Sequence, residues 1–229
     1  SAAESGGLRL VNLASLIEPH PAEAVALISR GEKTTYGQLR EQVAGFRGGL
    51  VNLGLEPGDR VALLCANNWY FVVAYLAALG AGLVAVPLNP SSPRRELERE
   101  LAAIGARALV VGPSGREAFA SVDRSATPAL EYVVGPAGAG AGESVTFDQL
   151  LGTEPAPLVD RADDDLAVLM FTSGTAGSPK AAMLTHGNLL ANLDQVQASP
   201  GRAQEAGDVS FAVIPLFHIF GLNVVLGGA

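Results

Sequence analysis

The stretch GDRVALLCANNWYFVVAYLAALGAGLVAVPLNPSSP, residues 58–93, decides the fold. It carries no charged side chain after its third residue, and residues 69–88 are almost purely apolar. That is close to the ~20 residues of a membrane-spanning helix. However, Gly80 and Gly82 interrupt the run, and β-branched residues and a proline close it. One buried strand, a buried helix, a turn and a second buried strand therefore explain this stretch better than a membrane span.

A helix is predicted on the N-terminal side of this stretch. Apolar residues recur at spacings of three and four from Tyr36 to Leu53, as on one helix face. Thr35 and Gln38 form a capping box at its start, and Gly54 suits its end.

A second helix is predicted on the other side, where Leu97, Leu101 and Ile104 share a face. Ser92 and Pro93 serve as its cap and first-turn proline, and Gly105 ends it. Short apolar runs predict strands at residues 61–64, 83–88, 108–111, 132–134 and 166–171. Repeated strand–helix–strand units of this kind predict an α/β fold, with a mostly parallel sheet flanked by helices on both faces.

The composition narrows the functional classes. The chain has 229 residues, is 48% hydrophobic and carries a net charge of −8, which disfavours nucleic acid as a partner. Its single cysteine, Cys65, ends an apolar run and is expected to be a small buried side chain. With no disulfide possible and no signal-peptide pattern at residues 1–10, we expect a cytoplasmic protein with at most peripheral membrane contact.

Candidate chemistry follows the strand at 166–171, in FTSGTAGSPKAAMLTHGN, residues 171–188. Eight of the nine residues from Thr172 to Lys180 are small, hydroxylic, glycine or proline. Exposed backbone amides, hydroxyl groups and one lysine together suit a polyphosphate. Pro179 and Ala181 flank the lysine, so the pattern is not a Walker loop. A glycine- and serine-rich hairpin without a ligand remains the alternative.

A second candidate segment is VIPLFHIFGLN, residues 213–223, which follows another apolar run that we interpret as a strand. His218 lies between Phe217 and Phe220, and by residue type alone a core histidine is the common case. His186 opens a predicted helix, where capping or packing is the expected role.

The motifs resemble those of the adenylate-forming (ANL) superfamily, which includes the acyl-CoA synthetases. TYGQL (35–39) and residues 58–93 are similar to its early segments. The phosphate-loop pattern is matched at Phe171, Thr172, Ser173, Gly174, Thr175, Gly177, Pro179, Lys180, Thr185, His186 and Asn188. Ala176 and Ala181 depart from it, replacing a threonine and a glycine.

The resemblance implies the N-terminal part of an acyl-CoA synthetase that uses ATP, Mg²⁺ and CoA on a carboxylic acid, expected to be a fatty acid. It implies an ATP and phosphate site at Thr172, Ser173, Gly174, Thr175, Ala176, Gly177 and Lys180. It also implies an acyl pocket at His218, Phe220 and Gly221. The chain is expected to hold neither a metal ligand nor a complete catalytic set.

The resemblance also divides the chain. Residues 1–160 correspond to an early α/β subdomain, and residues 161–229 to the phosphate loop and the start of the substrate-binding subdomain. The C-terminal domain is absent from this sequence, so the chain alone is expected to be inactive, and it can pair as a homodimer. Two alternatives stay open: a fatty acyl-AMP ligase that feeds a carrier protein, and a non-catalytic nucleotide-binding or dimerisation module.

Overall fold

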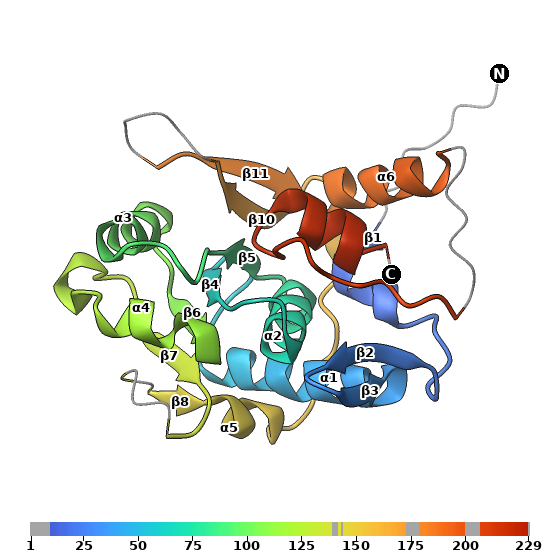
Figure 1. The fold of residues 1–229 in the computed structure, drawn as a ribbon, viewed down its shortest axis with the longest axis horizontal. Coiled ribbons are helices and arrows are strands. Elements are labelled where there is room, and N and C mark those ends of the chain that lie inside the picture. Colours follow the sequence, from blue (N-terminus) through green and yellow to red (C-terminus); the bar gives the residue numbers. More distant parts are fainter. Residues whose placement is uncertain (1–9, 139–141, 143, 173–178, 200–206, 229) are drawn as a thin grey trace.

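The computed structural model describes residues 10–138, 142, 144–172, 179–199 and 207–228. Its main sheet has the strand order β11-β10-β5-β4-β6-β7-β8 (Figure 1). In chain order these strands are β4 (Arg60–Leu64), β5 (Val84–Pro87), β6 (Ala108–Val111), β7 (Tyr132–Gly135), β8 (Val145–Thr146), β10 (Leu166–Phe171) and β11 (Ala181–Thr185). Every neighbouring pair is parallel except β10 and β11. The predicted α/β fold with a mostly parallel sheet is therefore confirmed.

Two antiparallel ribbons form apart from the main sheet. They are β1 (Leu10–Val11) with β9 (Arg161–Ala162), and β2 (Val25–Ser29) with β3 (Glu32–Thr35). The helices are α1 (Tyr36–Asn52), α2 (Trp69–Gly80), α3 (Arg94–Ile104), α4 (Arg116–Ala120), α5 (Phe147–Leu151) and α6 (His186–Gln197). Short helical turns are η1 (Leu13–Ile17), η2 (Pro113–Gly115), η3 (Arg124–Ala126) and the π-helical η4 (Phe220–Leu226).

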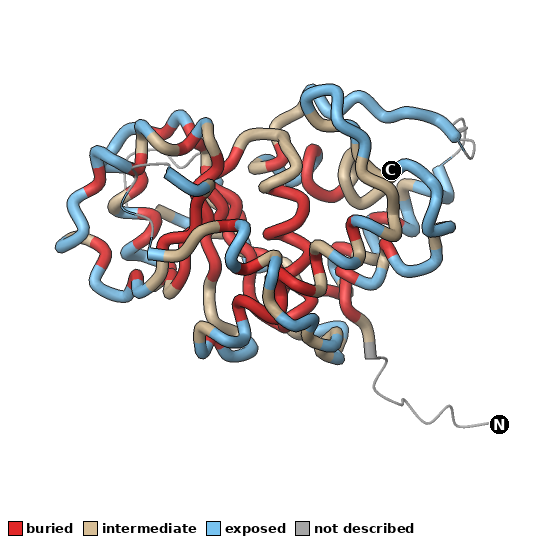
Figure 2. The backbone as a smooth tube through the Cα atoms, turned by 90° about the horizontal axis from the view of Figure 1, so that it is seen from below, coloured by how far each residue is buried: buried red, intermediate tan, exposed pale blue. Residues whose placement is uncertain are grey.

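Helices cover both faces of the sheet, as the sequence predicts. Strand β4 shows the division, because successive side chains of a strand point to opposite faces. Val61 and Leu63 belong to the core with α1, α2 and α5, whereas Ala62 and Leu64 belong to the core with α3 and α4. Figure 2 shows the buried residues gathered in the middle of the molecule, with exposed residues around them.

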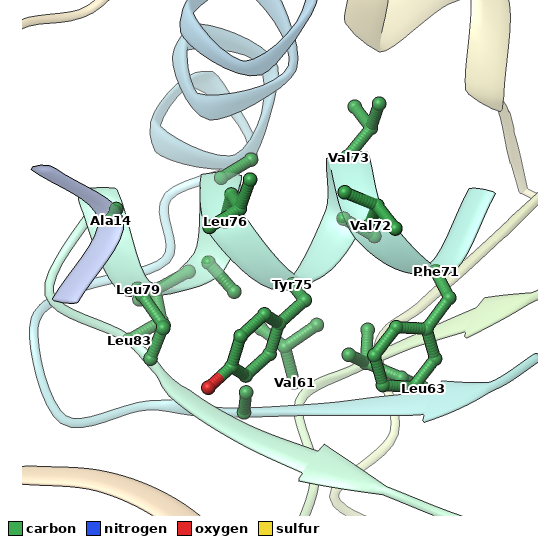
Figure 3. Close-up of a cluster of buried hydrophobic side chains, with 14 of the residues drawn as sticks. Ala14, Val61, Leu63, Phe71, Val72, Val73, Tyr75, Leu76, Leu79 and Leu83 are labelled. Carbon is green, nitrogen blue, oxygen red and sulfur yellow. The ribbon is translucent and has the colours of Figure 1, made fainter. Parts of the chain in front are cut away.

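Helix α2 and strand β5 account for the long apolar run. Phe71 and Tyr75 point from α2 toward Leu63 and Val61 on β4 (Figure 3). Full burial of such a side chain contributes about 2 kcal/mol. A left-handed turn at Gly82 (φ 74°) then leads into β5. No helix in the described ranges is long and apolar enough to span a bilayer, and the predicted helix, turn and strand are confirmed.

Most predicted helix ends are correct. The Thr35–Gln38 capping box is present at α1, and Gly54 after it and Gly105 after α3 are left-handed. The predicted start of α3 is wrong by one residue. Pro93 itself is the N-cap and stays extended (φ −60°, ψ 150°), so the buried Ser92 makes no cap hydrogen bond to the helix.

Candidate functional site

The candidate site lies at the carboxyl edge of the sheet. Strands β4, β5, β6 and β10 run in the same direction, so their carboxyl ends meet at one edge, where ligands of such sheets bind. β10 ends there at Phe171, and the chain returns in β11 with Ala181 opposite Phe171. The predicted phosphate segment is therefore the connection of a β-hairpin.

The base of this hairpin is closed by two hydrogen bonds. The Thr172 amide donates to the Lys180 carbonyl oxygen over 3.1 Å, and the Thr172 hydroxyl donates to the same oxygen over 3.4 Å. The site residues Ser173, Gly174, Thr175, Ala176 and Gly177 lie outside the described residues.

Thr172 and Lys180 are both exposed. Lys180 takes part in no salt bridge within the described ranges. Its ammonium group is thus available to an anion at the edge where the hairpin emerges. Phosphate binding by these residues stays a prediction.

The second candidate segment does not follow a strand, and that prediction is wrong. Residues 208–213 form no ladder with any described strand. Phe211 and Val213 are 85% and 69% exposed, so this apolar run has no sheet neighbour to cover it. A turn then follows, in which the His218 amide donates to the Pro215 carbonyl, and η4 begins at Phe220.

The three predicted acyl-pocket residues differ in exposure. His218 is exposed, with its ring 4.6 Å from that of Phe217, so it is not the core histidine that its residue type suggests. Phe220 is 54% exposed. Gly221 is buried, and a Cβ atom there would collide with the Pro215 carbonyl oxygen. Close backbone packing is thus one reason for this glycine.

Phe220 lines a groove of about 310 Å³ between η4 and the β11–α6 unit. The lining residues are Leu184, Asn188, Leu189, Asn192, Ile219, Phe220, Asn223 and Val224. Asn223 fixes the two walls together, since its Nδ2 donates to the Leu189 carbonyl over 3.0 Å and to Asn192 Oδ1 over 2.9 Å. Sequence reasoning missed the α6 wall, although the spacing of Asn188 and Asn192 places both on one helix face.

A larger hollow, about 450 Å³, is a poorer candidate. Its lining includes Asp163, Asp164 and Asp194, whose negative charges oppose the binding of both a carboxylate and a phosphate. No group of three metal-ligating side chains was found among the described residues. We therefore keep the hairpin and the adjoining groove as the candidate site.

His186 has the packing role that its position predicts. The side chain is fully buried, and its Nδ1 accepts a hydrogen bond from the Leu13 amide over 3.0 Å. Burial lowers the pKa of His186 to about 4; Arg161 adds to the lowering and Asp165 opposes it. Thr185 and Asn188 form a capping box at the same helix start. These three motif positions thus stabilise the start of α6, directly after the hairpin.

Comparison with known proteins identifies similar chains. Residues 15–229 match a family model described as "AMP-binding enzyme". A long-chain-fatty-acid–CoA ligase of Escherichia coli is 32% identical over 89% of this chain and 41% of its own length. A feruloyl-CoA synthase of Amycolatopsis is 36% identical, and the match covers 91% of this chain and 39% of that enzyme.

Among solved structures, ATP-bound MatB from Rhodopseudomonas palustris superposes with a TM-score of 0.76 at 30% identity. The match covers 95% of this chain and 42% of that one. The chain thus spans about two fifths of the length of these relatives.

Proposed function

Since the chain belongs to the AMP-binding enzyme family, we propose that it forms the N-terminal part of an ATP-dependent acyl-CoA synthetase. In the proposed reaction, a carboxylate oxygen attacks the α-phosphorus of ATP, which gives acyl-AMP and pyrophosphate. The thiol of CoA then attacks the acyl carbon, and AMP leaves. The similarity to two CoA-forming enzymes supports this assignment.

One observation carries the proposal: an anion-compatible hairpin lies where ligands bind in parallel sheets. Thr172 and Lys180 would hold the triphosphate from the hairpin base, together with the glycine and hydroxyl residues of its connection. The Lys180 ammonium would oppose the negative charge that accumulates on the leaving pyrophosphate. Mg²⁺ would accompany the bound ATP and help to oppose the same charge.

We propose that the carboxylic acid binds in the groove that Phe220 lines. Five of its eight lining side chains are apolar (Leu184, Leu189, Ile219, Phe220 and Val224), which suits a fatty or aryl tail. His218 and Gly221 lie on the same segment, and we place them beside the acyl group. We keep residues 1–160 and 161–229 as proposed subdomains, and we expect a cytoplasmic enzyme.

The function is tested by isotope exchange between pyrophosphate and ATP in the full-length polypeptide, with a panel of fatty and aryl acids. We expect exchange with at least one acid, and loss of at least 90% of it in Lys180→Ala. Absence of exchange with every acid would refute the proposal. The isolated chain should show no turnover. Thioester formation on CoA, rather than on a carrier protein, would separate a CoA synthetase from an acyl-AMP ligase.

A further inference from the structure

Asn67 connects the sheet edge to the segment that precedes His218. It lies in the loop directly after β4, and its carboxamide makes three hydrogen bonds to residues about 150 positions away. Nδ2 donates to the carbonyl oxygens of Ala212 and Ile214, over 2.9 and 2.8 Å. Oδ1 accepts from the Leu216 amide over 2.8 Å. The side chain therefore contacts every second residue of the segment.

The three bonds converge on one side chain because the segment curves around it. An extended strand would span about 13 Å from residue 212 to residue 216, too far for one carboxamide to reach both ends, but the chain bends at Ile214 and the Val213 amide donates to the Phe211 carbonyl. Hydrophobic burial does not hold the start of this segment in place, because Phe211 and Val213 are 85% and 69% exposed. Leu216, at its end, is buried. Hydrogen bonds from Asn67 thus hold the backbone of Ala212 and Ile214, just before the buried Leu216.

The location of Asn67 gives this contact a consequence for the candidate site. In the sheet, β4 is separated from β10 by β5 alone, and strands lie about 4.8 Å apart. The carboxyl end of β4 therefore lies about 10 Å from that of β10, where the hairpin begins, and Asn67 follows β4 at the same edge. Residues 212–216 are tied to the loop after β4, and His218 and Phe220 follow within a few residues.

We propose that Asn67 is a positioning residue of the acyl site: its carboxamide holds residues 212–216 at the sheet edge, and so sets where His218 and Phe220 lie relative to the phosphate hairpin. This inference rests on the proposed function. It predicts that Asn67 affects use of the carboxylic acid and leaves nucleotide binding unchanged.

Two variants and a neighbouring control test the proposal. Asn67→Ala removes all three hydrogen bonds. Asn67→Asp keeps the side-chain shape and the acceptor for the Leu216 amide. It loses both N–H donors and places a carboxylate against the carbonyl oxygens of Ala212 and Ile214. The control is Asn68→Ala, because the Asn68 side chain caps α2 by accepting from the Phe71 amide and, within the described residues, forms no hydrogen bond to residues 212–216. It destabilises the same loop without releasing the segment.

We expect both Asn67 variants of the full-length polypeptide to raise the KM for the acid at least tenfold, with the KM for ATP changed less than twofold. Hydrogen exchange in the peptide spanning residues 207–218 should accelerate in both variants and stay unchanged in Asn68→Ala. Unchanged acid KM in Asn67→Asp, or an equal rise in Asn68→Ala, would overturn the positioning role.

The two proposals fail in different ways. If unmodified protein activates no acid, the proposed function fails, and the positioning role fails with it. If unmodified protein is active and the Asn67 variants use the acid normally, only the positioning role fails.

Discussion

Two buried ionisable groups should give the folded chain opposing pH dependences that nearly cancel. Burial lowers the pKa of His186 to about 4 and raises that of Glu100 to about 7, where Glu96 adds to the rise. Among the residues that the structure describes, neither His186 Nε2 nor Glu100 Oε2 has a hydrogen-bond partner. Both side chains are therefore more stable in the fold when neutral.

The sign differs between the two groups. The unfolded histidine titrates near 6.5, so the stability that His186 contributes is present above pH 6.5 and is lost as the pH falls toward 4. The unfolded glutamate titrates near 4.5, so the stability that Glu100 contributes is present below pH 4.5 and is lost as the pH rises toward 7. One pKa unit corresponds to about 1.4 kcal/mol, so each full effect reaches about 3 kcal/mol.

The test is urea unfolding of the unmodified chain, His186→Gln and Glu100→Gln at several pH values between 4.5 and 7. The profile of the unmodified chain is the reference, because the lowered pKa values of Glu98 and Glu131 also make its stability depend on pH. Relative to that profile, His186→Gln should lose stability as the pH rises. Glu100→Gln should gain stability relative to it as the pH rises, by about 2 kcal/mol or more.

Each substitution also has a cost that does not depend on pH, such as a weaker hydrogen bond to Leu13. Comparing the slopes of the unfolding free energy against pH removes that cost. Parallel profiles for all three proteins would refute the reasoning, because neither group would then be held neutral by the fold.

Three further predictions concern substitution or labelling of single residues. Burial raises the pKa of Cys65 to about 12, so a thiol reagent at pH 8 should label it only on unfolding, and rapid labelling of folded protein would contradict its burial. Asn12→Ala should destabilise the chain by about 2 kcal/mol, because the Val159 carbonyl loses this donor and the Ala14 amide loses its acceptor, while the Leu79 carbonyl keeps the Gly82 amide; a change below 1 kcal/mol in urea unfolding would argue against this. Ala181→Gly should lower stability by about 0.5–1 kcal/mol, and a stabilised variant would show that the alanine is strained.

The parts of the fold predicted from sequence are those fixed by local chemistry. The spacing of apolar residues and the Thr35–Gln38 box determine α1 without reference to distant segments. Uninterrupted burial fixes α2 and β5, because both elements contact core on all sides. The carboxyl-edge location of the hairpin follows from the direction of β10 within a parallel sheet.

Other features depend on distant partners and leave little local signal. In residues 208–213, Val209, Phe211 and Val213 alternate with other residues as in a strand, yet the run pairs with no described strand, and its Ala212 carbonyl accepts from Asn67. Nothing near Asn67 in the sequence indicates this contact, because its partners lie about 150 residues away. The π-helical η4 likewise depends on packing of Gly221 against Pro215.

The two departures from the phosphate-loop pattern differ in what they imply. Ala181 is the first residue of β11 and pairs with Phe171 in a regular ladder. An extended strand accommodates a Cβ atom at no conformational cost, so this position has no need of glycine. Ala176 removes a hydroxyl group from the predicted anion site, where a hydrogen bond to a charged group is worth about 1.5–3 kcal/mol. Any loss of nucleotide affinity relative to the family pattern should therefore arise at Ala176, whereas Ala181 should be neutral because the hairpin base closes normally around it.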